Sequence, residues 1–323
     1  MIILLCLYRR MIMSSKRKLI STLLCVGALT AGLFVSGCGS EKAADTVSSA
    51  VSSATDTKSD EKVSKAFNEI IDATNKFNGN NTTWGQQHAE NLAKLKAGFD
   101  EHAINTQPKY DSLQNGLKKS KEIGNTYKEV DTERDNVLAV LDELVPISKE
   151  LASYSDSKAY LNDGKAKGNE LAAKYVAAVE KFNAAYGKLG DAVKAANKEQ
   201  TKKNLEKMKK DGYKNYAAAM EATLRLTDLV DKVEATQSNP DKAGVEKEIG
   251  EIQALLNGID TKDSHKESLV RNFNDTVGAI RQVMADPNDK YQDRNLNRMV
   301  QSFNHYIDVY NRIKPDSFDE KKK

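Results

Sequence analysis

A serine and a lysine at a catalytic spacing are the first residues in the sequence that suggest a reaction. Ser155 and Lys158 form a Ser-x-x-Lys pair, in which a lysine can assist a nucleophilic serine during acyl transfer. That chemistry also requires a Lys-Thr-Gly strand and a further polar loop, and neither is found in the chain. Because the pair lies beside an expected helix break, capping and solvation explain it, and we predict no catalytic residue.

The histidines are the next candidates, since imidazole is a common metal ligand. There are four of them, namely His88, His102, His265 and His305. His88 and His102 are fourteen positions apart, which places them about 21 Å apart along one straight helix, too far to share an ion. Ligands brought together from distant helices are the alternative. We predict solvated or boundary histidines and no metal site.

A short acidic segment has enough oxygen ligands to suggest calcium. It consists of Asp286, Asn288 and Asp289, with Asp293 nearby. An EF-hand loop requires glycine at its sixth position and glutamate at its twelfth, but Tyr291 and Asn297 stand there. The segment is therefore interpreted as a helix-capping turn.

One cluster of residues has the composition of a recognition surface, because it combines aromatic side chains with charges of both signs at an expected helix break. Its members are Tyr154, Tyr160, Asp163, Lys165 and Lys167. Tyrosine offers contact area together with a polar tip, as recognition surfaces often do. In the alternative interpretation the tyrosines pack a helical hairpin and the charges face water. We treat the cluster as a tentative recognition patch.

Cys38 is the residue whose surroundings predict a definite covalent modification. It follows a basic head at 16–18, an apolar run at 19–34, and then Val35, Ser36 and Gly37. This is the three-part layout of a secretory signal. Its end resembles the lipobox of bacterial lipoproteins.

The lipobox resemblance implies that a diacylglyceryl group is joined to the Cys38 thiol, that the chain is cut before Cys38, and that the new amino group can be acylated. Two or three acyl chains, at about 0.8 kcal/mol per buried methylene, would hold the protein on a membrane. We expect no other cofactor. The alternative is an uncleaved membrane helix with an incidental cysteine, since the apolar run approaches spanning length.

Charge and cysteine content narrow the class of protein further. The 49 basic and 46 acidic residues are interspersed and give a net charge of +3. Nucleic-acid binding requires a segregated basic face, so we expect no nucleic-acid partner. Cys6, Cys25 and Cys38 are the three cysteines, so the processed chain would have no intrachain disulfide and must be stabilised by packing.

The elements that must position these residues are helices. Apolar residues recur three and four positions apart, as in Leu269, Phe273, Val277, Ile280 and Met284, which is the spacing of one helix face. No alternating strand pattern is convincing. The sequence therefore predicts an all-α fold, an elongated antiparallel helical bundle preceded by a signal peptide and a disordered tether.

Proline, glycine and asparagine residues suggest where the helices begin and end, and we expect several of the segments to run on into one another. The expected helices are 61–77, 83–105, 108–145, 146–160, 164–197, 198–235, 241–257, 262–284 and 290–313.

The expected domain organisation has four parts. Residues from 39 to about 60 are rich in Ser, Ala, Thr, Asp and Lys, and such a segment cannot bury enough apolar surface to fold. The parts are a lipoprotein signal peptide (1–37, with 1–10 as a possible over-extended start), a lipidated cysteine and flexible tether (38–60), a helical-bundle domain (61–315) and a charged disordered tail (316–323).

The helical part resembles a known family in its aromatic and small residues. The matching motifs are Ser153-Tyr154, Lys158-Ala159-Tyr160, the run Asp163 to Gly168, and Phe303 to Tyr306. On these residues the chain is similar to the YiiG-like bacterial lipoproteins of unknown function, over about 61–313. The resemblance implies an all-helical, lipid-anchored extracytoplasmic domain, and it supplies no catalytic residues.

Together these observations predict a lipoprotein on the extracytoplasmic side of a bacterial plasma or outer membrane. We expect it to act as a non-enzymatic interaction or binding module, with the membrane contacted through its lipid anchor and an envelope protein or cell-wall component as its partner. The alternative is a solute-binding protein that holds a small ligand or metal between helices. A hydrolase built from scattered residues is a more distant alternative.

Replacing the anchor residue tests the expected lipidation. Cys38→Ala removes the thiol that would carry the diacylglyceryl group, so the mature body should be released or the precursor should remain uncut. Cell fractionation followed by intact-mass measurement distinguishes these states. Membrane retention of a fully processed Cys38→Ala protein would contradict lipidation at this residue.

Overall fold

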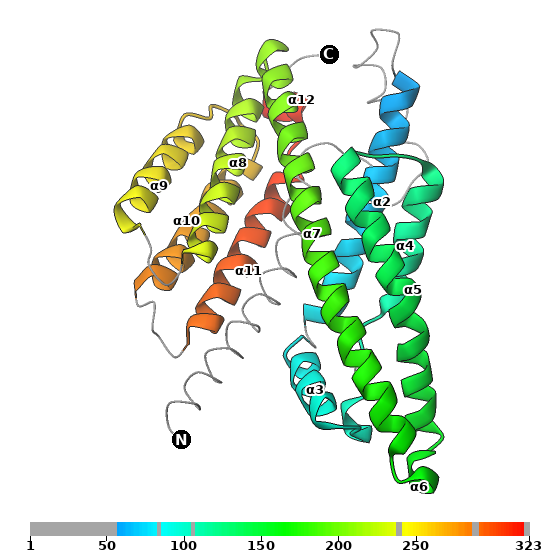
Figure 1. The fold of residues 1–323 in the computed structure, drawn as a ribbon. Coiled ribbons are helices and arrows are strands. Elements are labelled where there is room, and N and C mark those ends of the chain that lie inside the picture. The colour runs from blue at the N-terminus through cyan, green and yellow to red at the C-terminus, as the bar shows by residue number, and fades with distance from the viewer. Residues whose placement is uncertain (1–56, 83–84, 105–106, 237–240, 286–290, 320–323) are drawn as a thin grey trace. The chain divides into compact units, whose positions relative to one another are not determined.

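The computed structural model describes residues 57–82, 85–104, 107–236, 241–285 and 291–319. Within these ranges the chain forms helices and no strand, which confirms the predicted all-α class (Figure 1). The helices are α2 (Thr57–Thr82), α3 (Gly85–Ala97), the 3-10 helix η2 (Glu101–Ala103), α4 (Tyr110–Ile123), α5 (Lys128–Asp156), α6 (Tyr160–Asp163), α7 (Ala166–Lys210), α8 (Lys214–Ala235), α9 (Lys242–Asn257), α10 (His265–Ala285), α11 (Gln292–Tyr310) and α12 (Pro315–Phe318).

The described residues divide into two compact units rather than the one domain expected over 61–315. Unit 1 contains the described residues up to Ala196, and unit 2 contains those from Asn197 onward. The division falls inside α7. Each unit has its own cluster of buried apolar side chains, so each is described by itself.

Unit 1 is a set of antiparallel helices in which α2 and α4 approach very closely. The Ser120 hydroxyl donates to the Ala66 carbonyl at 2.8 Å, and Gly116 faces Ala73. Small residues at these positions allow the two backbones to come together. The largest buried side chains of the unit include Ile70, Leu113, Leu117, Leu141, Leu144, Leu151, Tyr175 and Leu189.

Unit 2 repeats the antiparallel arrangement with α8, α9, α10 and α11. Arg225 of α8 pairs with Glu248 of α9 at 2.6 Å, and Arg281 of α10 pairs with Glu246 of α9 at 2.7 Å. Phe273 and Tyr306 are fully buried between the helices. The buried Tyr306 hydroxyl lies 3.1 Å from the Thr223 hydroxyl, so its polar atom is satisfied inside the core.

Two expected helix boundaries lie inside longer helices. Pro146 is within α5, and the boundary expected between Asn197 and Lys198 is within α7. Pro146 is exposed, so water can satisfy the carbonyl that its missing amide leaves free, while buried neighbours hold the helix together. The actual breaks occur at Gly124 (φ 152°) and Gly212 (φ 80°), where glycine adopts a conformation that other residues avoid.

The two ends of the helical part also differ from expectation. Helix α2 begins at Thr57, so the expected tether over 38–60 is wrong for its last four residues. The signal peptide and Cys38 lie outside the described residues. The expected tail from residue 316 is wrong for its first four residues, because α12 folds onto unit 2 with Phe318 fully buried.

The carboxyl-terminal segment is attached to unit 2 by polar contacts as well as by Phe318. The Asp319 carboxylate accepts hydrogen bonds from the backbone amides of Asn215 (2.8 Å) and Tyr216 (3.0 Å) at the start of α8. These amides have no partner within the helix, and a carboxylate at a helix amino terminus also interacts favourably with the helix dipole. The packing of α12 is therefore part of the unit 2 fold.

Among the described residues, no helix is both long enough and apolar enough to cross a membrane.

A matched pair of glycine substitutions tests the close approach of α2 and α4. A Cβ at Gly116 would lie 2.5 Å from the Cβ of Ala73, so Gly116→Ala should lower the free energy of unfolding by about 1–2 kcal/mol despite the better helix propensity of alanine. Gly250 of α9 has no atom within 4 Å of the same position, so Gly250→Ala should raise that free energy by about 0.5–1 kcal/mol. Urea unfolding followed by circular dichroism measures both, and two changes of the same sign would contradict the packing.

Candidate functional site

The residues of the tentative recognition patch do come together, at the turn between α5 and α7. The Tyr154 hydroxyl donates to the Asp163 carboxylate at 2.6 Å. The same carboxylate accepts from the backbone amides of Lys165 (3.0 Å) and Lys167 (3.2 Å) at the start of α7. The hydrogen bond from Tyr154 lowers the pKa of Asp163. Both oxygens of the Asp163 carboxylate are thus engaged in hydrogen bonds that close the turn.

The two lysines and two tyrosines of the patch are also engaged within unit 1. Lys165 pairs with Glu101 at 3.2 Å, and Lys167 pairs with Glu150 at 2.8 Å. Tyr154 and Tyr160 both pack against the ring of Phe99, with centroids 5.1 and 5.5 Å apart. The geometry thus gives these residues a structural task, and their role in recognition stays a prediction.

Leu161 is the outward-facing residue of this turn that sequence reasoning missed. It lies on α6 and is 71% exposed. The backbone on either side is in the left-handed region at Lys158 (φ 53°) and Lys165 (φ 71°). Single exposed apolar residues are common on protein surfaces, so Leu161 by itself does not indicate a site.

The other residues considered for catalysis or metal binding do not form a site in the described part of the chain. Ser155 is buried within α5, whereas the Lys158 side chain is exposed beyond its end. The segment 286–290 and the side chain of Asp293 lie outside the described residues. No group of three or more His, Cys, Asp or Glu side chains with metal-binding geometry occurs among those described.

Serine, histidine and aspartate do meet at the start of α10, though not in the order of a catalytic triad. Asp263 lies 2.6 Å from Nδ1 of His265 and accepts from the Ser317 hydroxyl at 2.9 Å. A nucleophilic serine must instead donate its proton to the imidazole. As arranged, Asp263 joins α12 to the start of α10.

His88 is a histidine whose surroundings change its pKa. It lies on α3, and its Nε2 is 3.4 Å from the hydroxyl of the buried Tyr110. Burial lowers the pKa of His88 from 6.5 to about 4, because the charged imidazolium would lose its hydration. His88 is therefore neutral at pH 7 and lies half-buried at the boundary of unit 1.

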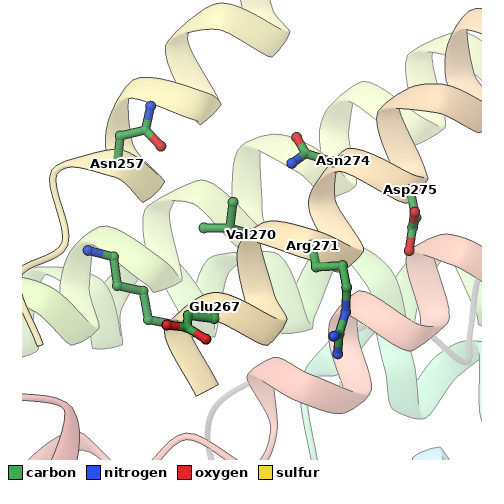
Figure 2. Close-up of a pocket in the computed structure, with 7 residues that line it drawn as sticks. Asn257, Glu267, Val270, Arg271, Asn274 and Asp275 are labelled. Atoms are coloured by element: carbon green, nitrogen blue, oxygen red, sulfur yellow. The ribbon is translucent and has the colours of Figure 1, made fainter. Parts of the chain in front are cut away.

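An open depression on unit 2 is lined by polar groups, several of which are unengaged (Figure 2). It has a volume of about 570 Å³ and is open to solvent. Asn257 lies at the end of α9, and the remaining lining residues lie along α10. The lining consists of Asn257, Lys266, Glu267, Val270, Arg271, Asn274 and Asp275.

Helical spacing explains why these residues share one side of α10. Positions 266, 270 and 274 are four apart, as are 267, 271 and 275, so they form two adjacent rows along the helix. Val270 is half-buried and packs against the core of unit 2, which gives the depression an apolar centre. The Lys266 ammonium donates to the backbone carbonyl of Ile259, in the connection between α9 and α10. That contact fixes one cationic group beside the depression.

Four polar side chains of the depression lack partners in the described part of the chain. Within the described residues, no hydrogen bond or ion pair engages the side chains of Glu267, Arg271, Asn274 or Asp275. Some charged groups of unit 2 are paired, as with Arg225 and Glu248, whereas the side chains of Arg298 and Arg312 also have no partner among the described residues. An arginine without a carboxylate keeps its planar set of donors free for a ligand.

Sequence reasoning missed the depression for a physical reason. The alternating charges of 266–275 follow the pattern of any solvated helix face. The distinguishing feature is the position of Asn257 across from that face, and it depends on how α9 packs against α10. No signal in the sequence indicates that packing.

The burial of His88 predicts how stability should depend on pH. The folded-state pKa lies below the unfolded value, so the contribution is complete above about pH 6.5 and is lost as the pH falls from 6.5 towards 4. The loss should be at most about 3 kcal/mol of unfolding free energy. Urea unfolding across this range measures it, and His88→Gln should remove most of the dependence.

His102→Gln is the matched control for this measurement, because His102 is exposed on η2. It should leave the pH dependence as it is in the unmodified protein. If His88→Gln and the unmodified protein lose stability equally between pH 6.5 and 4, the burial of His88 is not the cause.

Comparison with known proteins gives one match. No curated protein and no solved structure matches the chain. Residues 86–309 match a family model described as "Protein of unknown function (DUF3829)". Because this match covers more than half of the chain, the protein belongs to the DUF3829 family.

Proposed function

We propose that the protein is a lipid-anchored, extracytoplasmic lipoprotein of the YiiG-like kind that acts as a non-enzymatic binding module in the bacterial envelope. Val35, Ser36, Gly37 and Cys38 support the anchor, since they have the lipobox pattern behind a basic head and an apolar run. The diacylglyceryl group on Cys38 would hold the helical units at the outer side of the plasma or outer membrane. Membership of the DUF3829 family is compatible with this proposal and does not specify an activity.

The observation that carries the binding role is the set of unengaged polar side chains in the depression of unit 2. A charged side chain on a helix usually finds an opposite charge one turn away, and each such pair stabilises the helix by about 0.3–0.5 kcal/mol. Arg271 lies one turn from both Glu267 and Asp275, yet it is paired with neither. A partner can therefore engage these groups without breaking internal bonds.

The arrangement of the other polar groups supports binding rather than catalysis. A catalytic base must lie within hydrogen-bonding reach of the proton that it removes, and usually has a pKa near the working pH. His88 is half-buried and neutral at pH 7, and Asp263 separates Ser317 from His265. The contacts of these histidine, aspartate and serine side chains are therefore explained by packing and helix capping.

A second candidate function, the binding of a small solute between helices, is favoured by polar atoms buried in unit 1. The amide nitrogens of Asn78 and Gln107 are buried without a hydrogen-bond partner in the described residues. A solute with hydrogen-bond acceptors could satisfy such donors. The rings around Asn78 are nevertheless in contact, with Phe77 and Tyr186 5.4 Å apart. The open depression on unit 2 therefore supports binding better.

Photo-crosslinking in intact cells tests the proposed function. A photoreactive amino acid at Asn274 should give an adduct of defined mass after illumination, because Asn274 lines the depression with its side chain unengaged. Combining it with Arg271→Ala and Asp275→Asn should reduce the adduct at least fivefold. Cys38→Ala should also reduce it if the partner lies at the membrane.

A photoreactive residue at Arg298 is the control, because Arg298 is exposed on α11 and does not line the depression. Adducts of equal yield at both positions, or an Asn274 adduct that the Arg271 and Asp275 substitutions leave unchanged, would contradict a binding role for the depression.

A further inference from the structure

The depression is elongated along α10, and its length limits what it can hold. Lys266 and Asp275 are nine residues apart on one helix, which corresponds to about 13.5 Å along the axis. An extended peptide advances about 3.3 Å per residue. The lined stretch therefore matches about four residues of extended chain.

The order of charges along this stretch favours a ligand that carries both signs. Arg271 has Glu267 one turn before it and Asp275 one turn after it, and Lys266 lies at the start. Two cations and two anions leave the depression with no net charge. A polyanion would meet the carboxylates, and a polycation would meet the guanidinium and the ammonium. Arginine can bind a carboxylate through two parallel hydrogen bonds, while either acidic residue can bind an ammonium group.

The neutral lining residues favour a peptide backbone between the ligand's charges. Asn257 and Asn274 come from different helices and lie on opposite sides of the depression (Figure 2). The Asn257 amide oxygen already accepts from Nε2 of Gln253 at 3.1 Å, which leaves its two N–H donors for the carbonyl of an extended peptide. Asn274 has both its donors and its acceptor available, so it can pair with the amide and the carbonyl of that peptide. Val270 between them provides an apolar contact for a small side chain. No aromatic side chain lines the depression, and a sugar ring would therefore lack the stacking surface that aromatic residues give.

The open form of the depression bears on the source of the peptide. It is open to solvent rather than enclosed. A free small molecule would be better held by an enclosed cavity, where most of its surface is buried. An internal segment of a longer chain is compatible with an open depression.

We infer that the depression binds an extended segment of a protein partner, about four residues long, that carries one acidic and one basic side chain. This inference rests on the proposed binding function and specifies its ligand. The acidic side chain binds Arg271, the basic side chain binds Asp275 or Glu267, and the backbone between them binds Asn257 and Asn274. An ion pair between Arg271 and Glu267 or Asp275 within α10 would compete only weakly with the ligand, because an exposed ion pair one turn apart contributes only about 0.3–0.5 kcal/mol.

Fluorescence anisotropy with labelled tetrapeptides tests this inference on the mature, lipid-anchored protein in detergent micelles. The probe is Lys-Ala-Ala-Glu blocked at both ends, and the comparison peptides are tetra-alanine, tetra-glutamate and tetra-lysine blocked in the same way. The mixed-charge peptide should bind at least tenfold more tightly than each of the others. Its affinity should fall as salt is raised, because the contacts are exposed and are screened.

Substitutions in the depression should act on the mixed-charge peptide specifically. Arg271→Gln should weaken its binding about tenfold, since a bidentate charged contact is lost, and Asp275→Asn combined with Glu267→Gln should do the same. Arg298→Gln, on an exposed surface outside the depression, should leave binding unchanged. Circular dichroism confirms that each variant stays folded.

Equal binding of tetra-alanine, or undiminished binding by the Arg271→Gln protein, would overturn the inference. Tighter binding of the same sequence built from D-residues would overturn the assignment to a protein segment and favour a cell-wall peptide. An Asn274 photo-adduct that depends on Arg271 in cells, together with no peptide binding in solution, would retain the binding module and reject the peptide as its ligand. Loss of both signals would reject the binding module itself.

Discussion

The apolar stripe of α7 is the constraint on which the core of unit 1 depends. Leu171, Tyr175, Phe182 and Leu189 of this helix are buried in the core of unit 1, and Leu205 is buried in the core of unit 2. A helix of 45 residues gains most of its stability in a protein from the packing of such a stripe rather than from intrinsic propensity. The other helices of unit 1 bury that stripe in a shared core, so the identity of these side chains determines which helices can assemble.

The polar residues differ in whether their side chains already have hydrogen-bond partners. At the α5–α7 turn, Asp163 is saturated by Tyr154 and by two backbone amides, so its charge closes a connection between helices. Along α10, by contrast, Arg271 and Asp275 have no partner among the described residues. The presence of charge therefore does not show whether a group has a structural role. That depends on whether the molecule already engages the hydrogen-bonding capacity of the group.

The helices could largely be predicted from the sequence because their apolar spacing is strong. The pattern at Leu269, Phe273 and Val277 placed α10 within a few residues of its actual ends. Prediction failed where a local signal was opposed by packing, as at Pro146, whose exposed position lets α5 continue. It also failed at Phe318, since one buried ring in a charged segment outweighs the composition around it. The patch at Tyr154 and Asp163 could be predicted as a cluster because its members are close in the sequence. The depression could not, because Asn257 meets α10 only through tertiary packing.

The packing of α12 against unit 2 affects when unit 2 can fold during synthesis. The first amides of α8 receive their cap from Asp319, and the core around α8 receives the ring of Phe318. Residues 214–216 and 318–319 are separated by about one hundred positions of chain, so unit 2 cannot complete its fold during synthesis until residue 319 has been added and has emerged. A nascent chain that lacks this segment therefore lacks both the cap of α8 and the buried ring of Phe318. For the same reason, a fusion partner must be joined beyond residue 319 if the unit is to close.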